Sequence, residues 1–143
     1  MRPFCLAAES HDVQQILATM REVRDSPVDY LERLLEAVVA YLGLSRRMMR
    51  SSALDVPAAM RGQQRILEIA RRLGATRYVN APGGTRLYDH NAFADAGIEL
   101  GFLDPYPGPS CSILTRLIEE TRDSVAEDIR KTTKYVLEKG PLA

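Results

Sequence analysis

The residues of this chain whose types and spacing could do chemistry are concentrated in one loop, Asn-Ala-Pro-Gly-Gly at residues 80–84. Asn80 carries a hydrogen-bond donor and an acceptor on one side chain. Gly83 and Gly84 can adopt positive φ, which would let backbone N–H groups approach an anion or a carbonyl closely. Pro82 removes one donor and stiffens the start of the loop. The loop therefore predicts a binding site for a polar or anionic small molecule.

Other polar residues are candidates for the same site. Gln64 lies in the first turn of a helix predicted to begin at Gly62, where unpaired N–H groups and the helix dipole favour a negatively charged group. Ser51 and Ser52 add two hydroxyls, and Tyr88 follows the loop. The predicted substrate-binding residues are Ser51, Ser52, Gln64, Asn80, Gly83, Gly84 and Tyr88.

Each of these residues also has a purely structural interpretation. A Pro-Gly-Gly sequence after a strand can be a tight turn that needs positive φ. The two serines can satisfy local backbone groups, and Tyr88 can pack at the edge of the core. Only the convergence of these segments favours a binding site.

Catalytic residues are not identified by the sequence. His90, beside Asp89, is a weak candidate for a general base, although Asp89 is favoured as a helix cap. His11 beside Asp12 could form a dyad, but a surface histidine at a helix start is the favoured interpretation. Cys111 precedes a predicted helix, a position that would make its thiol more nucleophilic. No base accompanies it, so a small buried side chain is expected.

The two cysteines, Cys5 and Cys111, belong to no CxxC or Cys/His cluster. The sequence therefore predicts no disulfide framework, no metal site and no evident cofactor, and a reducing cytoplasm fits this cysteine usage. Lys+Arg and Asp+Glu are balanced at 19 each, so no net field attracts nucleic acid or anionic lipid. No apolar run approaches the roughly 20 residues that span a bilayer. We expect no nucleic-acid or membrane partner.

With 143 residues, 45% of them hydrophobic, the chain can cover one core, so we expect a single α/β domain over residues 1–143. Residues 3–8 predict a short buried strand, followed by a helix that Ser10 caps. Ser26 and Pro27 begin a second helix, which Gly43 ends.

The middle of the chain alternates predicted strands and helices. Residues 46–50 predict a strand, Gly62 begins a helix that ends at Gly74, and residues 77–79 predict the next strand. A short helix from Asp89 to Gly97 precedes a strand over residues 98–103. This order predicts a small parallel sheet with flanking helices, a β-α-β-α-β unit with Rossmann-like layering.

Helices are expected to complete the chain. Residues 104–109 contain three prolines and predict an irregular corner. Ser112 caps an apolar helix after it. A final helix is predicted to place four residues on one face: Val125, Ile129, Thr132 and Val136.

Strands joined through helices run parallel, and open parallel sheets bind ligands outside the carboxyl ends of their strands. Residues 51–52, 80–84 and 104–105 each follow a predicted strand. We therefore expect these three segments to meet at one edge of the sheet.

One run of sequence resembles a known family. Residues 73–89, then Phe93, residues 96–98 and residues 102–103, are similar to the WbqC-like family. The similarity extends upstream through residues 50–54 and 62–66, and weakly downstream through 105–114. The usual members begin with an additional segment that contains a Gln-Pro-x-Tyr-type start and Asp-Asp and Arg-Asn-Arg clusters. We expect this chain to correspond to the C-terminal portion, without that segment.

The resemblance implies a context of surface polysaccharide and sugar-modifying pathways. Family members look like enzymes that attach an acyl or aminoacyl group to an amino sugar, so a sugar nucleotide or an acyl or aminoacyl donor is the implied small molecule. The resemblance thus favours a transferase or a truncated form of one. The alternative is a non-catalytic partner subunit or metabolite-binding domain, with a protein partner that completes the site.

Overall fold

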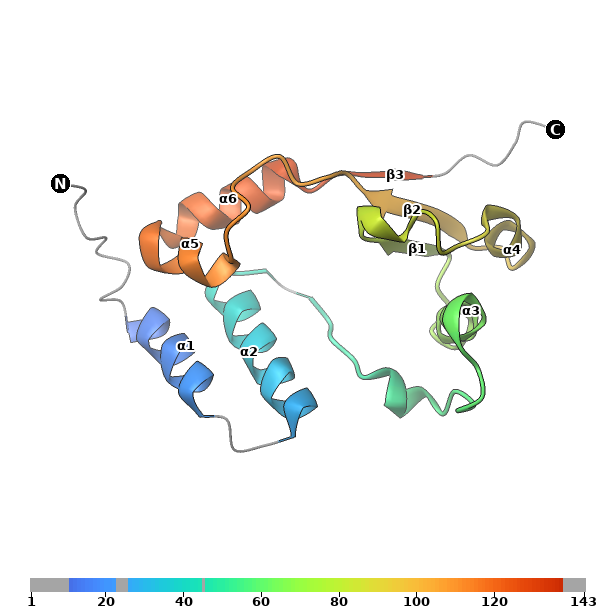
Figure 1. Cartoon of the computed structure of the whole chain (residues 1–143), viewed down its shortest axis with the longest axis horizontal. Helices are drawn as coiled ribbons and strands as arrows, with labels where there is room; N and C mark the ends of the chain where they lie inside the picture. Colours follow the sequence, from blue (N-terminus) through green and yellow to red (C-terminus); the bar gives the residue numbers. More distant parts are fainter. Residues whose placement is uncertain (1–10, 23–25, 45, 138–143) are drawn as a thin grey trace. The chain divides into compact units, whose positions relative to one another are not determined.

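The computed structural model describes residues 11–22, 26–44 and 46–137, whose helices and strands are shown in Figure 1. The chain divides into two compact units, called below the helical unit (residues 1–47 and 108–132) and the strand unit (residues 48–107 and 133–143). The single domain over residues 1–143 stays a prediction. No helix in the described ranges is long and apolar enough to cross a membrane.

The helical unit contains α1 (His11–Arg21), α2 (Pro27–Tyr41), α5 (Ile113–Glu119) and α6 (Arg122–Thr132). The predicted start of α2 is confirmed, because the Asp29 N–H donates to Ser26 Oγ over 3.2 Å and Pro27 lies in the first turn. Gly43, with φ at +63°, follows the end of α2 as predicted. The buried core of this unit is made of Ile16, Val38, Leu42, Leu117, Val125 and Ala126.

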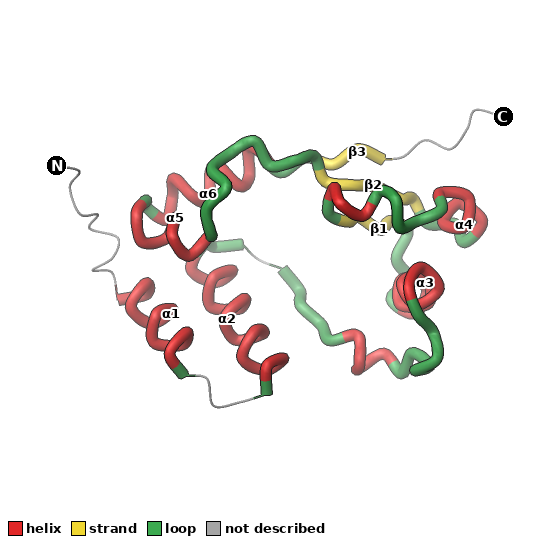
Figure 2. The backbone as a smooth tube through the Cα atoms, viewed as in Figure 1, coloured by secondary structure: helices red, strands yellow, loops and turns green. Residues whose placement is uncertain are grey.

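The strand unit contains three strands, β1 (Arg77–Asn80), β2 (Glu99–Leu103) and β3 (Tyr135–Leu137), with α3 (Gly62–Arg72), α4 (His90–Asp95) and two short 3-10 helices, η2 (Ser51–Leu54) and η3 (Pro82–Gly84). The sheet order is β1-β2-β3 (Figure 2). β1 and β2 are parallel, with Arg77 opposite Glu99, whereas β2 and β3 are antiparallel, with Leu103 opposite Tyr135. The buried core is made of Ala70, Phe93, Ile98, Leu100 and Phe102.

The same turn leads into both parallel strands. After α3, the Ala75 N–H donates to the carbonyl oxygen of Ala70 over 2.9 Å, and Gly74 between them has φ at +61°. After α4, the Ile98 N–H donates to the carbonyl oxygen of Phe93 over 2.9 Å, and Gly97 has φ at +71°. Both are Schellman turns, in which a positive-φ glycine lets the chain reverse and satisfies helix carbonyls. The predicted helix ends at these two glycines are confirmed.

The mixed α/β class is confirmed, but the Rossmann-like β-α-β-α-β order is not. Residues 46 to 50 form no strand, because every one of them is exposed and no face is buried against a neighbour. Ser51 and Ser52, predicted to follow that strand as loop residues, lie instead in η2. The parallel pair is therefore β1 and β2, with a short antiparallel strand added.

The predicted final helix is too long. α6 ends at Thr132, and Val136 lies in β3, opposite Phe102. Backbone pairing with β2 replaces further helix here. Thr132 and Thr133 are β-branched and disfavour continuation of α6, whereas the three residues of β3 gain hydrogen bonds to β2. The strand predicted at residues 3–8 lies outside the described residues.

Candidate functional site

The carboxyl ends of β1 and β2 meet at one edge of the sheet, as expected for parallel strands. Asn80 is opposite Phe102 in the register, so the segments that follow the two strands leave the sheet from this edge. Three segments were expected to meet at this edge, and only residues 80–84 and 104–105 follow the strands there. Ser51 and Ser52 lie in η2, whose Leu54 carbonyl oxygen accepts a hydrogen bond of 2.6 Å from Arg72 in the last turn of α3.

The Gly-Gly loop does not use positive φ. Residues 82 to 84 form η3, and neither Gly83 nor Gly84 is among the positive-φ glycines of the described residues, so that expectation is wrong. The Gly84 N–H donates to the carbonyl oxygen of Ala81 over 2.9 Å, and the Gly84 carbonyl oxygen accepts from the Leu87 N–H over 2.9 Å. These peptide groups therefore close the turn and are not directed at a ligand.

Close packing explains why a glycine stands at position 84. Gly84 is buried, and a Cβ atom there would lie 2.8 Å from Asn80 Nδ2 and 3.3 Å from Phe102 Cε1. By contrast, a Cβ atom at Gly83 would meet nothing within 4 Å. Gly84 thus fits the loop against the end of β2, while Gly83 is on the surface.

Asn80 and Tyr88 are joined by a chain of hydrogen bonds. Asn80 Oδ1 accepts from the Ala81 N–H over 2.8 Å, and Asn80 Nδ2 donates to the Tyr88 hydroxyl oxygen over 3.1 Å. The Tyr88 hydroxyl in turn lies 3.1 Å from the Tyr78 hydroxyl. Asn80, Tyr78 and Tyr88 are all half-buried. We call these three residues the tyrosine–asparagine cluster.

Aromatic packing holds the cluster in place. The Tyr78 ring stacks on Phe93 with a centroid distance of 5.6 Å, and the Tyr88 ring meets Phe93 edge to face at 5.7 Å. Burial, followed by the hydrogen bond with Tyr88, raises the pKa of Tyr78. Tyr78 therefore stays a neutral phenol at physiological pH. Tyr78 was predicted only as part of a strand and not as a site residue, although alternation along β1 puts the side chains of Tyr78 and Asn80 on the same face.

The start of α3 is connected to the end of the loop. Asp89 N–H donates to Gln63 Oε1 over 2.6 Å, and the Asp89 carboxylate caps α4 by accepting from the Asn91 N–H over 3.0 Å. The predicted cap is confirmed, and Gln63 is a further residue that sequence reasoning did not single out as a partner of this loop. His90, half-buried, is the first residue of α4, and its role as a base stays a prediction.

An open groove lies along α3 in the strand unit. Its volume is about 740 Å³, and it is lined by Met60, Gln64, Leu67, Glu68, Arg71, Gly74, Ala75, Ala96 and Ile98. Gly74 and Ala75 lie in the turn that leads into β1, and Ala96 and Ile98 lie in the turn that leads into β2. This groove, called below the α3 groove, is therefore bordered by the two turns before the amino ends of the parallel strands. Of the predicted site residues, Gln64 belongs to it.

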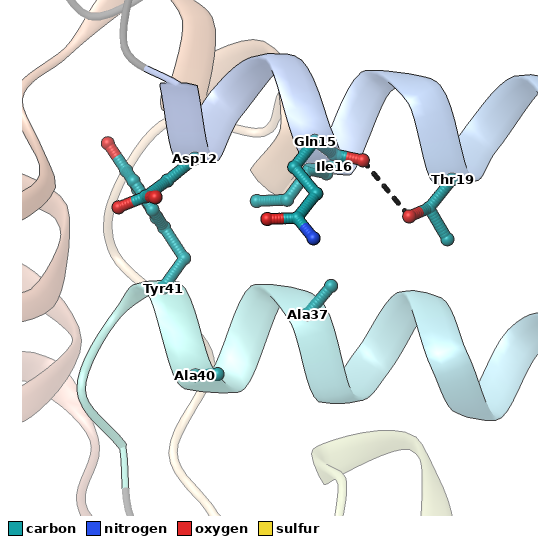
Figure 3. Close-up of a pocket in the computed structure, with 7 residues that line it drawn as sticks. All are labelled: Asp12, Gln15, Ile16, Thr19, Ala37, Ala40 and Tyr41. Carbon is teal, nitrogen blue, oxygen red and sulfur yellow. Dashed lines mark hydrogen bonds between the residues drawn. The ribbon is translucent and has the colours of Figure 1, made fainter.

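A second cavity, of about 370 Å³, lies between α1 and α2 in the helical unit (Figure 3). Three of its polar residues, Asp12, Gln15 and Thr19, come from α1, and Tyr41 comes from α2. Thr19 Oγ1 donates to the carbonyl oxygen of Gln15 over 3.0 Å, an interaction within α1. The His11–Asp12 pair therefore lies beside this cavity, in a different unit from the loop at residues 80–84.

One expectation about the helical unit is wrong, because Cys111 is exposed and not buried. In the same unit, Arg116 has a side chain only 7% exposed and binds Glu120 through two nitrogens at 2.6 and 2.9 Å and Asp128 at 2.6 Å. The hydrogen bonds from Arg116 hold the pKa of Glu120 below its usual range. Two carboxylates thus compensate the buried guanidinium, and the group joins α5 to α6.

Comparison with known proteins gives one match. The model of the WbqC-like protein family matches residues 8–112, which is well over half of the chain. The match includes α1 and α2, begins further upstream than the residues quoted for the resemblance, and ends at Ser112, the cap of α5. No curated protein and no solved structure matches this chain.

Proposed function

We propose that this chain, which belongs to the WbqC-like protein family, binds a polar small molecule at the carboxyl ends of β1 and β2 and acts in the modification of an amino sugar or polysaccharide. In this proposal the chain is an acyl or aminoacyl transferase or a truncated form of one. Family membership supports the pathway. The observation that carries the binding site is the tyrosine–asparagine cluster.

The chemistry of the cluster suits a neutral polar group. Two phenol hydroxyls and a carboxamide offer both donors and acceptors, as the hydroxyl and amide groups of a sugar require. The loop is less suited to an anion than its glycines predict, because the N–H groups of Ala81, Gly84 and Leu87 already donate within the loop. We therefore place the sugar, and not a phosphate, against Asn80 and Tyr88.

The transfer step needs a base that accepts a proton from the attacking amine. His90 is the only histidine among the described residues of the strand unit, and it lies two positions after Tyr88. His90 remains our candidate for this role. Gln64 and Gly83 are proposed contacts of lesser weight, because neither belongs to the cluster. Ser51 and Ser52 lie in η2, which is bonded to the last turn of α3, and we leave them out of this site.

Calorimetric titration of the protein with UDP-glucosamine tests the binding site. We expect Asn80→Ala to weaken binding at least tenfold, because the carboxamide supplies both a donor and an acceptor. Tyr30→Phe is a matched control for Tyr88→Phe, since the Tyr30 hydroxyl donates to the carbonyl oxygen of Met20 in the helical unit. Equal affinities for the wild type, Asn80→Ala and Tyr88→Phe, with unchanged melting profiles, would mean that the cluster is not part of the binding site.

One observation favours the alternative of a partner subunit. Val28, Leu31 and Leu35 follow each other on one face of α2 and are 57%, 55% and 57% exposed. A row of large apolar side chains is typical of a protein-binding surface. Light scattering of this chain mixed with the product of a neighbouring gene measures such a complex. A complex that Leu31→Glu abolishes, together with transfer activity only in the mixture, would favour this alternative.

A further inference from the structure

We propose that the α3 groove is a second binding site, and that it takes a straight-chain aliphatic carboxylate with its chain along α3 and its carboxylate at Arg71. This site is independent of the proposed function, because it is lined by the turns that precede β1 and β2 and by no residue of the tyrosine–asparagine cluster.

The shape of the groove favours a long, narrow ligand. One wall is a row on α3 with helical spacing: Gln64, Leu67, Glu68 and Arg71. The seven residue steps from Gln64 to Arg71 extend over roughly 10 Å along the helix axis. The small side chains of Ala75 and Ala96 and the absent side chain of Gly74 leave the opposite wall low. The volume, about 740 Å³, lies within the range of small-molecule sites.

The opposite wall can contact a hydrocarbon chain without leaving its backbone N–H groups unpaired. The N–H groups of Gly74, Ala75, Ala96 and Ile98 all donate to carbonyl oxygens of the preceding helices, over 3.1, 2.9, 3.1 and 2.9 Å. An aliphatic chain that covers this wall therefore leaves none of these donors without a partner. The side chains of Met60, Leu67 and Ile98 provide apolar contact.

The charges at the rim favour an anionic head group. Glu68 is the only acidic residue among those that line the groove, and it accepts hydrogen bonds from two guanidinium groups, Arg71 at 2.8 Å and Arg72 at 2.6 Å. Arg72 does not itself line the groove, but it is the second partner of Glu68, so this group of three side chains has a net charge of +1. Arg71 is 70% exposed and can turn to a carboxylate, because Glu68 keeps Arg72 as its partner.

Calorimetry and amide chemical shifts with acetate, butanoate, hexanoate and octanoate test the chain. We expect affinity to rise with each methylene, by up to about fourfold, until the groove is full. Amide shifts should change at Leu67, Ala75 and Ala96. Octanoate that binds no more tightly than acetate, or that shifts amides elsewhere, would overturn the proposal.

Paired variants test the position of each part of the ligand. Ala96→Leu should fill the groove and abolish the dependence on chain length, whereas Ala94→Leu, at an exposed position of α4 outside the groove, should keep it. Arg71→Gln should lower the affinity for octanoate at least fivefold and leave that for octanamide unchanged. Equal effects of Ala96→Leu and Ala94→Leu, or an equal loss of both ligands in Arg71→Gln, would contradict the assignment. The chemical-shift map of the wild type decides the question if a variant does not fold.

Discussion

The two ends of the parallel strands β1 and β2 use glycine for opposite purposes. At the carboxyl end, Gly84 has ordinary backbone geometry and is small enough to pack against Asn80 and Phe102. At the amino end, Gly74 and Gly97 have open space around them but need positive φ. Hydrogen bonds within the loop hold the carboxyl end together, whereas the turns at the amino end border the α3 groove. A glycine in a sequence therefore identifies a turn but not the reason for the glycine.

The largest effect is expected at the carboxyl end. Gly84→Ala should destabilise the protein by about 1–3 kcal/mol, the usual cost of overpacking, because the new methyl group would lie 2.8 Å from Asn80 Nδ2. Gly83→Ala, next to it and with space for a methyl group, should change stability by less than about 0.5 kcal/mol. Urea unfolding midpoints measure both. Equal losses in the two variants would mean that packing does not explain Gly84.

The amino end should respond to backbone strain and not to size. Gly97→Ala should cost about 1–2 kcal/mol, because φ at this position is +71°. Gly97→Asn, a larger residue that tolerates positive φ better, should cost less. Thermal unfolding distinguishes the two variants. A greater loss for asparagine than for alanine would show that space, as at Gly84, is the limiting factor here too.

A smaller effect is expected from the hydrogen bonds of the cluster. Tyr88→Phe removes the hydroxyl that accepts from Asn80 Nδ2 and contacts Tyr78, so we expect a loss of about 0.5–1.5 kcal/mol. The change keeps the ring contacts with Phe93. Chemical denaturation measures it. No loss of stability would mean that water replaces the hydroxyl without cost, and that the carboxyl end is more open than its hydrogen bonds suggest.

The smallest effect concerns how the stability of the protein depends on pH through Glu68, which lines the α3 groove. Hydrogen bonds from Arg71, and then from Arg72, lower the pKa of Glu68 to about 2 from an ordinary value of 4.5. A carboxylate with a lowered pKa stabilises the folded state above pH 4.5, and this contribution is lost as the pH falls toward 2. Glu68→Gln should therefore melt slightly below the wild type at pH 7, and the gap should close at pH 2.5. A gap that is constant with pH would exclude this ion pair as its cause.

Local signals in the sequence predicted most of the helix boundaries. Ser26, Asp89 and Ser112 each cap the helix expected, and Gly74 and Gly97 end theirs, because these residues act through bonds to their own neighbours. The strand at residues 46–50 and the helix through Val136 were wrong, since both depend on whether a distant strand is available for pairing.

The candidate site was predictable in part for the same reason. The loop at residues 80–84 and Tyr88 were found from residue type, and the structure places Asn80, Gly84 and Tyr88 together. Tyr78 and the Arg116 network could not be found in this way. Tyr88 lies ten residues from Tyr78, and Asp128 lies on the helix after that of Arg116. The third partner, Glu120, is only four residues from Arg116, but the burial of the guanidinium depends on the packed structure.

The connection between β2 and β3 has a consequence for how the chain can be divided. Within this connection, residues 108–132, with α5 and α6, belong to the helical unit, and the residues on either side belong to the strand unit. At the two ends of the connection, the Asp104 N–H donates to the carbonyl oxygen of Lys134 over 2.9 Å. An insertion whose ends meet adds only about 3 kcal/mol of length-dependent closure entropy for some thirty residues. Replacing residues 105–133 with a tight turn would join β2 and β3 as a hairpin and spare the sheet. The same excision would remove Leu117, Val125 and Ala126 from the other core, so the two units tolerate the loss of one segment very differently.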